Sequence, residues 1–150
     1  EERLQNAYQF TFTPGGTIDR SAMPVSDLGP TVGNIGVEGL SYDPRTGTFY
    51  GVKEKTPQRV FSAAMDFSTA SSVATVNDLF APALPVTDLS DIQVLATVPG
   101  VAGSSINNFL IFSQESNLLM EVTPTGTVVS SFSTAFLGRD NIEGVTIDAN

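Results

Sequence analysis

The stretch VEGLSYDPRTG, Val37 to Gly47, has a near copy in IEGVTIDAN, Ile142 to Asn150. Both copies place a glutamate and a glycine before a segment in which apolar and polar residues alternate, a pattern typical of a β-strand with one buried face. In the first copy DPRTG follows, where Pro44 favours a type I turn and Gly47 supplies the left-handed residue after it. The motif therefore predicts a strand that enters a tight hairpin.

The rest of the chain continues as predicted strands separated by turn residues, without a long segment that has helical apolar spacing. One group of four predicted strands covers 37–42, 48–53, 59–65 and 72–79, and a second covers 89–95, 109–113, 118–122 and 127–133. Alignment of VEGLSYD, LSDIQVL and IEGVTID makes Glu38, Ser90 and Glu143 equivalent, at spacings of 52 and 53 residues (90 − 38 and 143 − 90). A repeat of this length with four strands is typical of propeller blades, although a meander without blades can have similar spacing by chance.

We therefore predict an all-β chain that forms part of a β-propeller of four-stranded antiparallel blades, with about two full blades and flanking strands. We expect one fragment of a propeller domain over 1–150, with an N-terminal strand region at 1–30, blades at 34–80 and 86–133, and the start of the next blade at 139–150. Propellers close with about four to eight blades. The chain is therefore expected to be a piece of a longer protein or to assemble from several copies, with self-association through exposed blade faces.

The composition is acidic, with 7 basic against 16 acidic residues, a net charge of −9 and a sequence pI near 4.1. This balance argues against binding to nucleic acid or to anionic lipid, and it is compatible with cation binding. The absence of cysteine and histidine excludes disulfides, thiolate metal sites and a Ser-His-Asp triad within this chain. The apolar runs are too short to span a bilayer, so no membrane insertion is expected.

Four segments carry a resemblance to a known family: NIGVEGLSYDPRTGTFYGVKEKTPQRVF, DLSDIQVL, NNFLIFSQESNLLMEVTPTGTVVSSF and DNIEGVTID. Over 34–150 the chain resembles the SdiA-regulated bacterial propeller family and the related esterase-like phytase group. This resemblance implies a propeller of roughly five or six blades. It also implies a secreted, often multidomain bacterial protein, and extracellular or periplasmic localisation is therefore expected, with a leader that is not in this chain.

The first strands of the repeats carry the candidate metal ligands Glu38, Asp91 and Glu143. In a propeller the first strand of each blade lines the central channel, so these carboxylates would converge on one opening of it. Converging carboxylates repel one another unless a cation or protons lie between them, and oxygen ligands favour Ca²⁺ over Mg²⁺. The alternatives are solvated acids that bond to nearby backbone amides and a catalytic carboxylate. No organic cofactor is expected.

A second set of charged and polar side chains follows the second strands of both repeats, where the strand ends reach the same rim. This candidate ligand rim consists of Lys53, Glu54, Lys55, Arg59, Gln114 and Glu115. The set could hold a small polar or phosphorylated ligand, or it could form local ion pairs of about 0–1 kcal/mol each. Two functions are expected: a secreted propeller module that binds Ca²⁺ and a ligand or partner inside a larger protein, or a metal-dependent hydrolase of phosphoesters or other esters, which the resemblance implies would be phytase-like.

Overall fold

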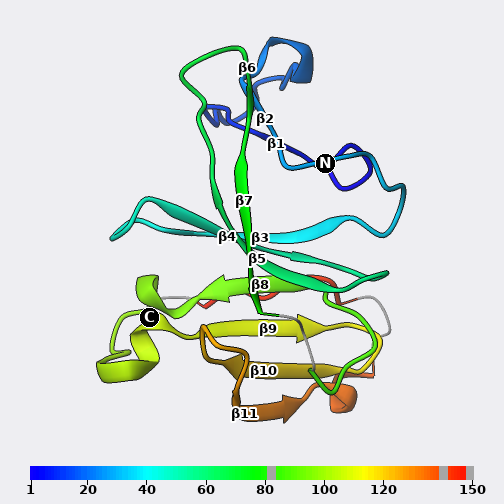
Figure 1. Cartoon of the computed structure of the whole chain (residues 1–150), viewed down its shortest axis with the longest axis vertical. Helices are drawn as coiled ribbons and strands as arrows, with labels where there is room; N and C mark the ends of the chain where they lie inside the picture. The colour runs from blue at the N-terminus through cyan, green and yellow to red at the C-terminus, as the bar shows by residue number, and fades with distance from the viewer. Residues whose placement is uncertain (81–83, 139–141, 148–150) are drawn as a thin grey trace.

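A computed structural model describes residues 1–80, 84–138 and 142–147, and its described part is all-β with short 3-10 turns. The strands form three sheets, which we call the N-terminal, central and C-terminal sheets. The central sheet lies between the other two along the long axis of the molecule (Figure 1). The predicted all-β class is confirmed.

The central sheet is an antiparallel meander of β3 (Val37–Asp43), β4 (Thr48–Lys53), β5 (Arg59–Ala64) and β7 (Thr75–Phe80), in that spatial order. Its first hairpin closes as the sequence predicts. Oδ1 of Asp43 accepts the backbone N–H of Arg45 at 2.9 Å, and Gly47 has a φ of 70°. The N–H of Gly47 then donates to the carbonyl of Asp43 at 2.9 Å, which closes the turn before β4 begins.

The C-terminal sheet repeats this order with β8 (Asp91–Val94), β9 (Phe109–Ser113), β10 (Leu118–Val122) and β11 (Val128–Ser133). The insertion between β8 and β9 contains two 3-10 turns, η2 (Leu95–Thr97) and η3 (Gly103–Asn107), and η4 (Ala135–Leu137) follows β11. Strand β8 is shorter than the predicted 89–95 because the chain turns into η2 at Leu95. Both predicted groups of four strands thus form antiparallel meanders.

The N-terminal sheet consists of β1 (Asn6–Tyr8), β2 (Val25–Asp27) and β6 (Ser71–Val73), with the 3-10 turn η1 (Arg20–Ala22) between β1 and β2. The single strand predicted over 72–79 is wrong in one respect. Its first residues form β6, which pairs in parallel with β2, and only 75–80 join the central sheet. The change of partner occurs at Ala74, whose N–H donates to the carbonyl of Asp27 at 2.8 Å.

Two hydrophobic clusters hold the three sheets together. The larger joins the central and C-terminal sheets, where Val52 and Val60 pack with the buried residues Ile92, Ile111 and Met120. The smaller covers the opposite face of the central sheet and consists of Ala7, Leu28, Phe61 and Ala63. Both faces of the middle strands β4 and β5 are therefore covered, which explains their many apolar positions.

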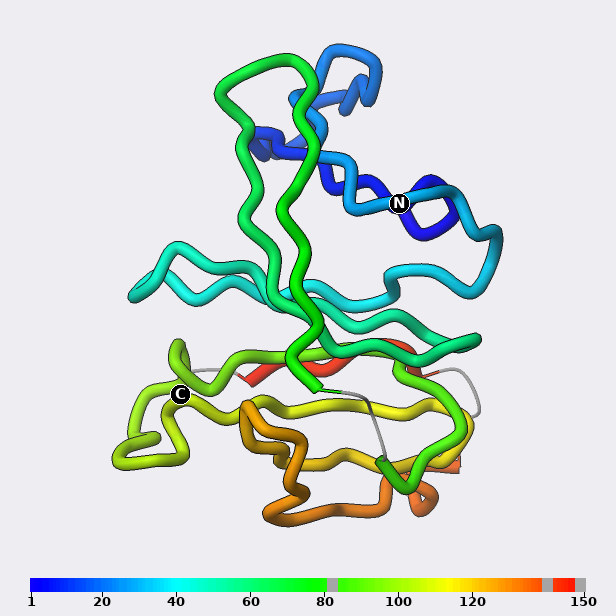
Figure 2. Tube along the Cα trace, in the orientation of Figure 1, coloured from blue at the N-terminus to red at the C-terminus, as the bar shows by residue number. Residues whose placement is uncertain are grey.

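Residues 142–147 run beside β8, at its free edge in the C-terminal sheet (Figure 2). The sequence predicts them as the first strand of a further repeat, but they do not form a strand. The backbone N–H of Val145 nevertheless donates to Oδ2 of Asp91 at 2.8 Å. The flanking residues 139–141 and 148–150 of the predicted next blade lie outside the described residues.

Gly39 allows β3 and β8 to approach closely. A Cβ atom at this position would lie 2.6 Å from Cα and from Oδ1 of Asp91, and 2.7 Å from the N of Ile92. Distances this short do not occur in real structures, so a side chain here would force the two sheets apart. The glycine of the VEG motif is thus a requirement of sheet packing.

We expect Gly39→Ala to lower the free energy of unfolding by about 1–3 kcal/mol, because the added methyl group overlaps backbone that cannot move alone. The matched control is Gly144→Ala, where the nearest atom is Oδ2 of Asp91 at an ordinary 3.6 Å. That variant is expected to change stability by less than about 0.5 kcal/mol. Urea unfolding of both variants measures the difference, and equal stabilities would contradict the packing role of Gly39.

Candidate functional site

An acidic pocket of about 260 Å³ lies at the end of the sheets where β3 begins and β4 ends. Glu38 is the second residue of β3, Glu54 follows β4 directly, Glu2 precedes β1, and Glu143 belongs to the segment beside β8. The lining also includes Asn34, Asp88, Ser90 and Gln114. Four segments that are distant in the sequence therefore bring glutamates to one place.

Three of these glutamates form a close group, which we call the carboxylate triad: Glu2, Glu38 and Glu54. One carboxylate oxygen from each lies within 4.8 Å of the others. Gly36 positions two of them, since its N–H donates to Oε1 of Glu2 at 3.1 Å and its carbonyl accepts the N–H of Glu54 at 2.9 Å. A Cβ at Gly36 would lie 2.3 Å from the carbonyl oxygen of Glu2, so only glycine permits this close contact.

The three carboxylates of the triad repel one another at this short distance when all of them are ionised. Burial, repulsion by Glu2 and a hydrogen bond to Glu2 raise the pKa of Glu38 to about 7, and the charges of Glu54 and Glu143 add to this effect. An ordinary glutamate has a pKa near 4.5. At neutral pH the site therefore gains free energy by holding either a proton or a cation.

We expect stability without divalent cations to fall as the pH rises from about 5 to 7.5. The folded state binds a proton at Glu38 that the unfolded chain has already released in this window, so stability is lost as that proton leaves. The chain contains no histidine, so no imidazole titrates in the same range. With EDTA present throughout, the midpoint of thermal unfolding is expected to fall by about 2–5 °C as the pH rises over this range. Glu38→Gln is expected to remove this fall. If the midpoint of that variant still falls equally with rising pH, the proton is not held by Glu38.

Asp91 does not line the acidic pocket, although the sequence places it with Glu38 and Glu143 as a metal ligand. Its Oδ1 accepts the N–H of Ile92 and its Oδ2 accepts the N–H of Val145, both at 2.8 Å. Burial raises the pKa of Asp91, while these two backbone hydrogen bonds lower it. Of the three predicted ligands, the pocket unites Glu38 and Glu143, and Asp91 instead holds the segment that carries Glu143.

Asp91→Ala is expected to release the segment at Val145. Because the backbone N–H loses its acceptor, exchange of the Val145 amide hydrogen is expected to speed up at least tenfold, and stability is expected to fall by about 1–3 kcal/mol. Hydrogen exchange followed by NMR measures the first effect. Asp91→Asn keeps one acceptor oxygen for the two N–H groups of Ile92 and Val145, so its effect on stability is expected to be smaller than that of Asp91→Ala. Unchanged Val145 exchange in Asp91→Ala would contradict this role.

The basic residues of the predicted ligand rim have partners within the fold. Lys53 is only 5% exposed, and its Nζ donates to backbone carbonyls of the following turn, including that of Pro57 at 3.3 Å. Burial, and next the charge of Arg59, lowers the pKa of Lys53. Nε of Arg59 pairs with Oδ1 of Asp78 at 2.7 Å, and its guanidinium lies over the ring of Phe61. Lys53 and Arg59 therefore stabilise the central sheet.

The other rim residues lie at or next to the acidic pocket. Nζ of Lys55 donates to Oε1 of Glu115 and also pairs with Oε1 of Glu54 at 3.0 Å, and these two hydrogen bonds, in that order, raise the pKa of Lys55. Gln114 lines the pocket, and its backbone N–H donates to the hydroxyl of Ser90 at 3.0 Å. The Lys55 ammonium thus neutralises part of the acidic charge of the pocket.

Glu2 and Asp88 are pocket residues that the sequence does not reveal. Glu2 lies outside the repeat, so no spacing points to it. In the aligned repeats Asp88 corresponds to Gly36, which lies 52 residues earlier (88 − 36). The first repeat therefore has no acid at the equivalent position that could point to Asp88. It is only 2% exposed and accepts hydrogen bonds from the Ser90 hydroxyl at 2.8 Å, the Glu115 N–H at 3.1 Å and the Ser113 hydroxyl. Asp88 therefore organises the turn that carries Gln114 and Glu115.

The pocket combines the chemical properties of a hard-cation site. Carboxylate oxygens are the preferred protein ligands of Ca²⁺, and amide and hydroxyl oxygens complete its shell of six to eight ligands. Asn34, Ser90 and Gln114 place such groups in the lining. A carboxyl group with a pKa near neutrality is also suited to general acid–base chemistry.

A comparison with known protein families finds a match over the whole chain. A family model described as SdiA-regulated matches residues 1–150. The helical segments of the described residues, 1–80, 84–138 and 142–147, are short 3-10 turns. None of them is long and apolar enough to cross a membrane.

Proposed function

Because this chain belongs to the SdiA-regulated family, we propose that it is part of a β-propeller module that binds Ca²⁺ at the carboxylate triad and engages a ligand or partner within a larger, secreted protein. The single observation that carries the proposal is the group of Glu2, Glu38 and Glu54, with carboxylate oxygens within 4.8 Å of one another. The acidic composition supports an extracellular or periplasmic setting, where Ca²⁺ is abundant.

Regular contacts between successive repeats support the propeller architecture. The hydroxyl of Ser41, on β3, accepts the N–H of Val94 at 3.0 Å, and Asp91, on β8, accepts the N–H of Val145 at 2.8 Å. In both contacts a side chain on the first strand of one repeat accepts a backbone N–H from the first segment of the following repeat. The two residues are 53 positions apart in the first contact and 54 in the second (94 − 41 and 145 − 91). Such nearest-neighbour contacts are what a ring of blades requires.

The outer face of the C-terminal sheet supports a further packing partner. Phe112, Leu119 and Phe132 are cross-strand neighbours on the face opposite Ile111 and Met120, and Phe132 is 58% exposed. Val52 and Val60 occupy the corresponding face of the central sheet, where the C-terminal sheet covers them. We propose that a further sheet of the same kind, or a second copy of this chain, packs on the outer face.

The pocket geometry supports Ca²⁺ as the ion. Three carboxylates supply the negative charge, and Glu143 lies on the same lining. A bound divalent cation would offset the repulsion among the carboxylates and lower the pKa of Glu38 again, because a nearby opposite charge favours the ionised carboxylate. The ion would also tie the segment before β1 to the start of β3 and the end of β4, and so join the N-terminal and central sheets.

Saturating Ca²⁺ is expected to raise the midpoint of thermal unfolding by about 5–10 °C over EDTA, since an ion present at 100 times its dissociation constant contributes about 2.7 kcal/mol. Glu38→Gln and Glu54→Gln are each expected to remove most of this shift. Asp66→Asn is the matched control, because it removes the same charge at an exposed site that bonds only locally, to the N–H of Ser68. A midpoint that does not respond to Ca²⁺ or EDTA would rule out the calcium site.

The near-neutral pKa of Glu38 favours a second candidate function, metal-dependent hydrolysis of phosphoesters or other esters. The same protein preparations distinguish the two functions in a phosphatase and esterase screen with Ca²⁺ present. Ester turnover that disappears in Glu38→Gln and persists in Asp66→Asn would establish the hydrolase and reject the pure binding module. Calcium-dependent stabilisation without turnover supports the binding module.

A further inference from the structure

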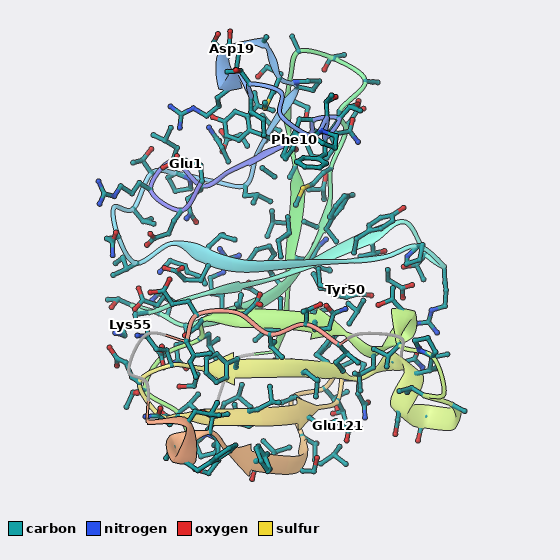
Figure 3. All side chains as sticks on the ribbon, turned by 180° about the vertical axis from the view of Figure 1, so that it is seen from behind. Glu1, Phe10, Asp19, Tyr50, Lys55 and Glu121 are labelled. Carbon is teal, nitrogen blue, oxygen red and sulfur yellow. The ribbon has the colours of Figure 1, made fainter. Side chains whose placement is uncertain are left out.

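A second pocket of about 260 Å³ lies at the opposite end of the same two sheets, where β3 ends and β9 begins. It is separate from the carboxylate triad and from the predicted ligand rim, since they share no lining residue. Tyr50 lines it, and Figure 3 shows Tyr50 well away from Lys55, which marks the acidic end. Its volume is slightly below the usual range of small-molecule sites, about 300–1,000 Å³, so it suits a ligand with a single ring.

The charged groups of this second pocket are balanced. Asp43 and Arg45 form a two-pronged ion pair, with Nε to Oδ1 at 3.0 Å and Nη2 to Oδ2 at 2.8 Å. The guanidinium of Arg45 holds the pKa of Asp43 below its ordinary value, so the pair stays charged and is neutral as a unit. Nη2 of Arg45 also reaches Oδ1 of Asn107 at 3.1 Å, which fixes the pair against η3. A ligand with net charge of either sign would therefore find no unpaired counter-charge on this wall.

The remaining walls combine an aromatic surface with amide groups. The rings of Tyr50 and Phe109 pack together with centroids 5.0 Å apart, and Val94 lies buried beside them. Asn108 is only 6% exposed, and its Nδ2 donates to Oε1 of Glu121 at 2.6 Å, which orients its amide. Within the described residues no hydrogen bond involves the Tyr50 hydroxyl. The pocket thus offers one apolar face and hydrogen-bonding groups that both donate and accept.

We propose that this second pocket binds an uncharged, hydroxyl-rich molecule the size of one sugar residue. A pyranose ring has an apolar C–H face that packs on an aromatic ring, and hydroxyls around its edge that both donate and accept. The tyrosine ring and the planar Asp, Arg and Asn side chains match these two features. Phosphates, carboxylates and amines would lose hydration on entry and would find no unpaired counter-charge on this wall to replace it. The balanced charge therefore selects against them. The site is independent of the calcium proposal.

Chemical-shift mapping on the ¹⁵N-labelled full chain tests the proposal, with methyl α-D-glucopyranoside and N-acetyl-D-glucosamine as probes and sodium acetate as the charged comparison. We expect at least one sugar to shift the amides of residues 45–50 and 106–109, with a dissociation constant of about 1–10 mM. The amides around Glu38 and Glu54 are expected to stay unchanged. Acetate at the same concentrations is expected to leave residues 45–50 and 106–109 unshifted.

Tyr50→Phe removes the hydroxyl and keeps the ring, so it is expected to weaken sugar binding about 3–10-fold, the range for one hydrogen bond. Asn107→Ala tests the polar wall without touching the core and is expected to have an effect of similar size. Tyr42→Phe is the matched control, because Tyr42 packs on Phe49 on the other face of the central sheet. Calcium stabilisation is expected to persist in all three variants.

Three results would overturn the proposal. The first is the absence of sugar-induced shifts in this region at about ten times the expected dissociation constant. The second is an acetate response equal to the sugar response, which would mark the pocket as an anion site. The third is equal weakening in Tyr42→Phe and Tyr50→Phe, since the hydroxyl of Tyr50 would then have no special role.

Discussion

The close approach of β3 to β8 at Gly39 is the contact on which the rest of the structure depends. Because no side chain separates the two strands there, Val52 and Val60 reach Ile92, Ile111 and Met120, and the two meanders share one core. The contact also sets the relative position of the two sheets, so that the starts of β3 and β8 lie at the same end of these sheets, beside the acidic pocket. Both pockets lie at the ends of this shared core, and each takes its walls from both sheets.

The same contact separates two acids that occupy neighbouring places in the repeat. Asp91 lies against the backbone and accepts N–H groups from Ile92 and Val145, so its charge is used to join segments. Glu38 precedes the glycine and meets Glu2 and Glu54 in the acidic pocket, where burial and the neighbouring carboxylates raise its pKa. Adjacent positions of the repeat therefore carry different chemistry, because the backbone groups that face them differ.

The N-terminal segment has two roles that arise from long-range packing. Ala7 and Leu28 cover Phe61 and Ala63, which would otherwise leave one face of the central sheet exposed. The turn before β1 packs on Gly36 and brings Glu2 to Glu38 and Glu54. The segment that completes the hydrophobic core thus also completes the carboxylate triad, so cation binding and the stability of the N-terminal sheet are linked.

The sequence by itself determined the two groups of four strands, apart from the split at Ala74, and it also determined the hairpin at Asp43 to Gly47 and the recurrence of glutamate at the start of the repeats. These features depend on alternation and turn chemistry, which act over a few residues. It could not show that β6 pairs with β2, that Glu2 joins the pocket, or that Asp91 bonds to Val145. Each of these involves residues more than 30 positions apart, and their meeting depends on which faces are buried together. Only the tertiary structure decided which of the recurring acids share one pocket, because the spacing of a repeat specifies equivalent positions and not the groups that surround them.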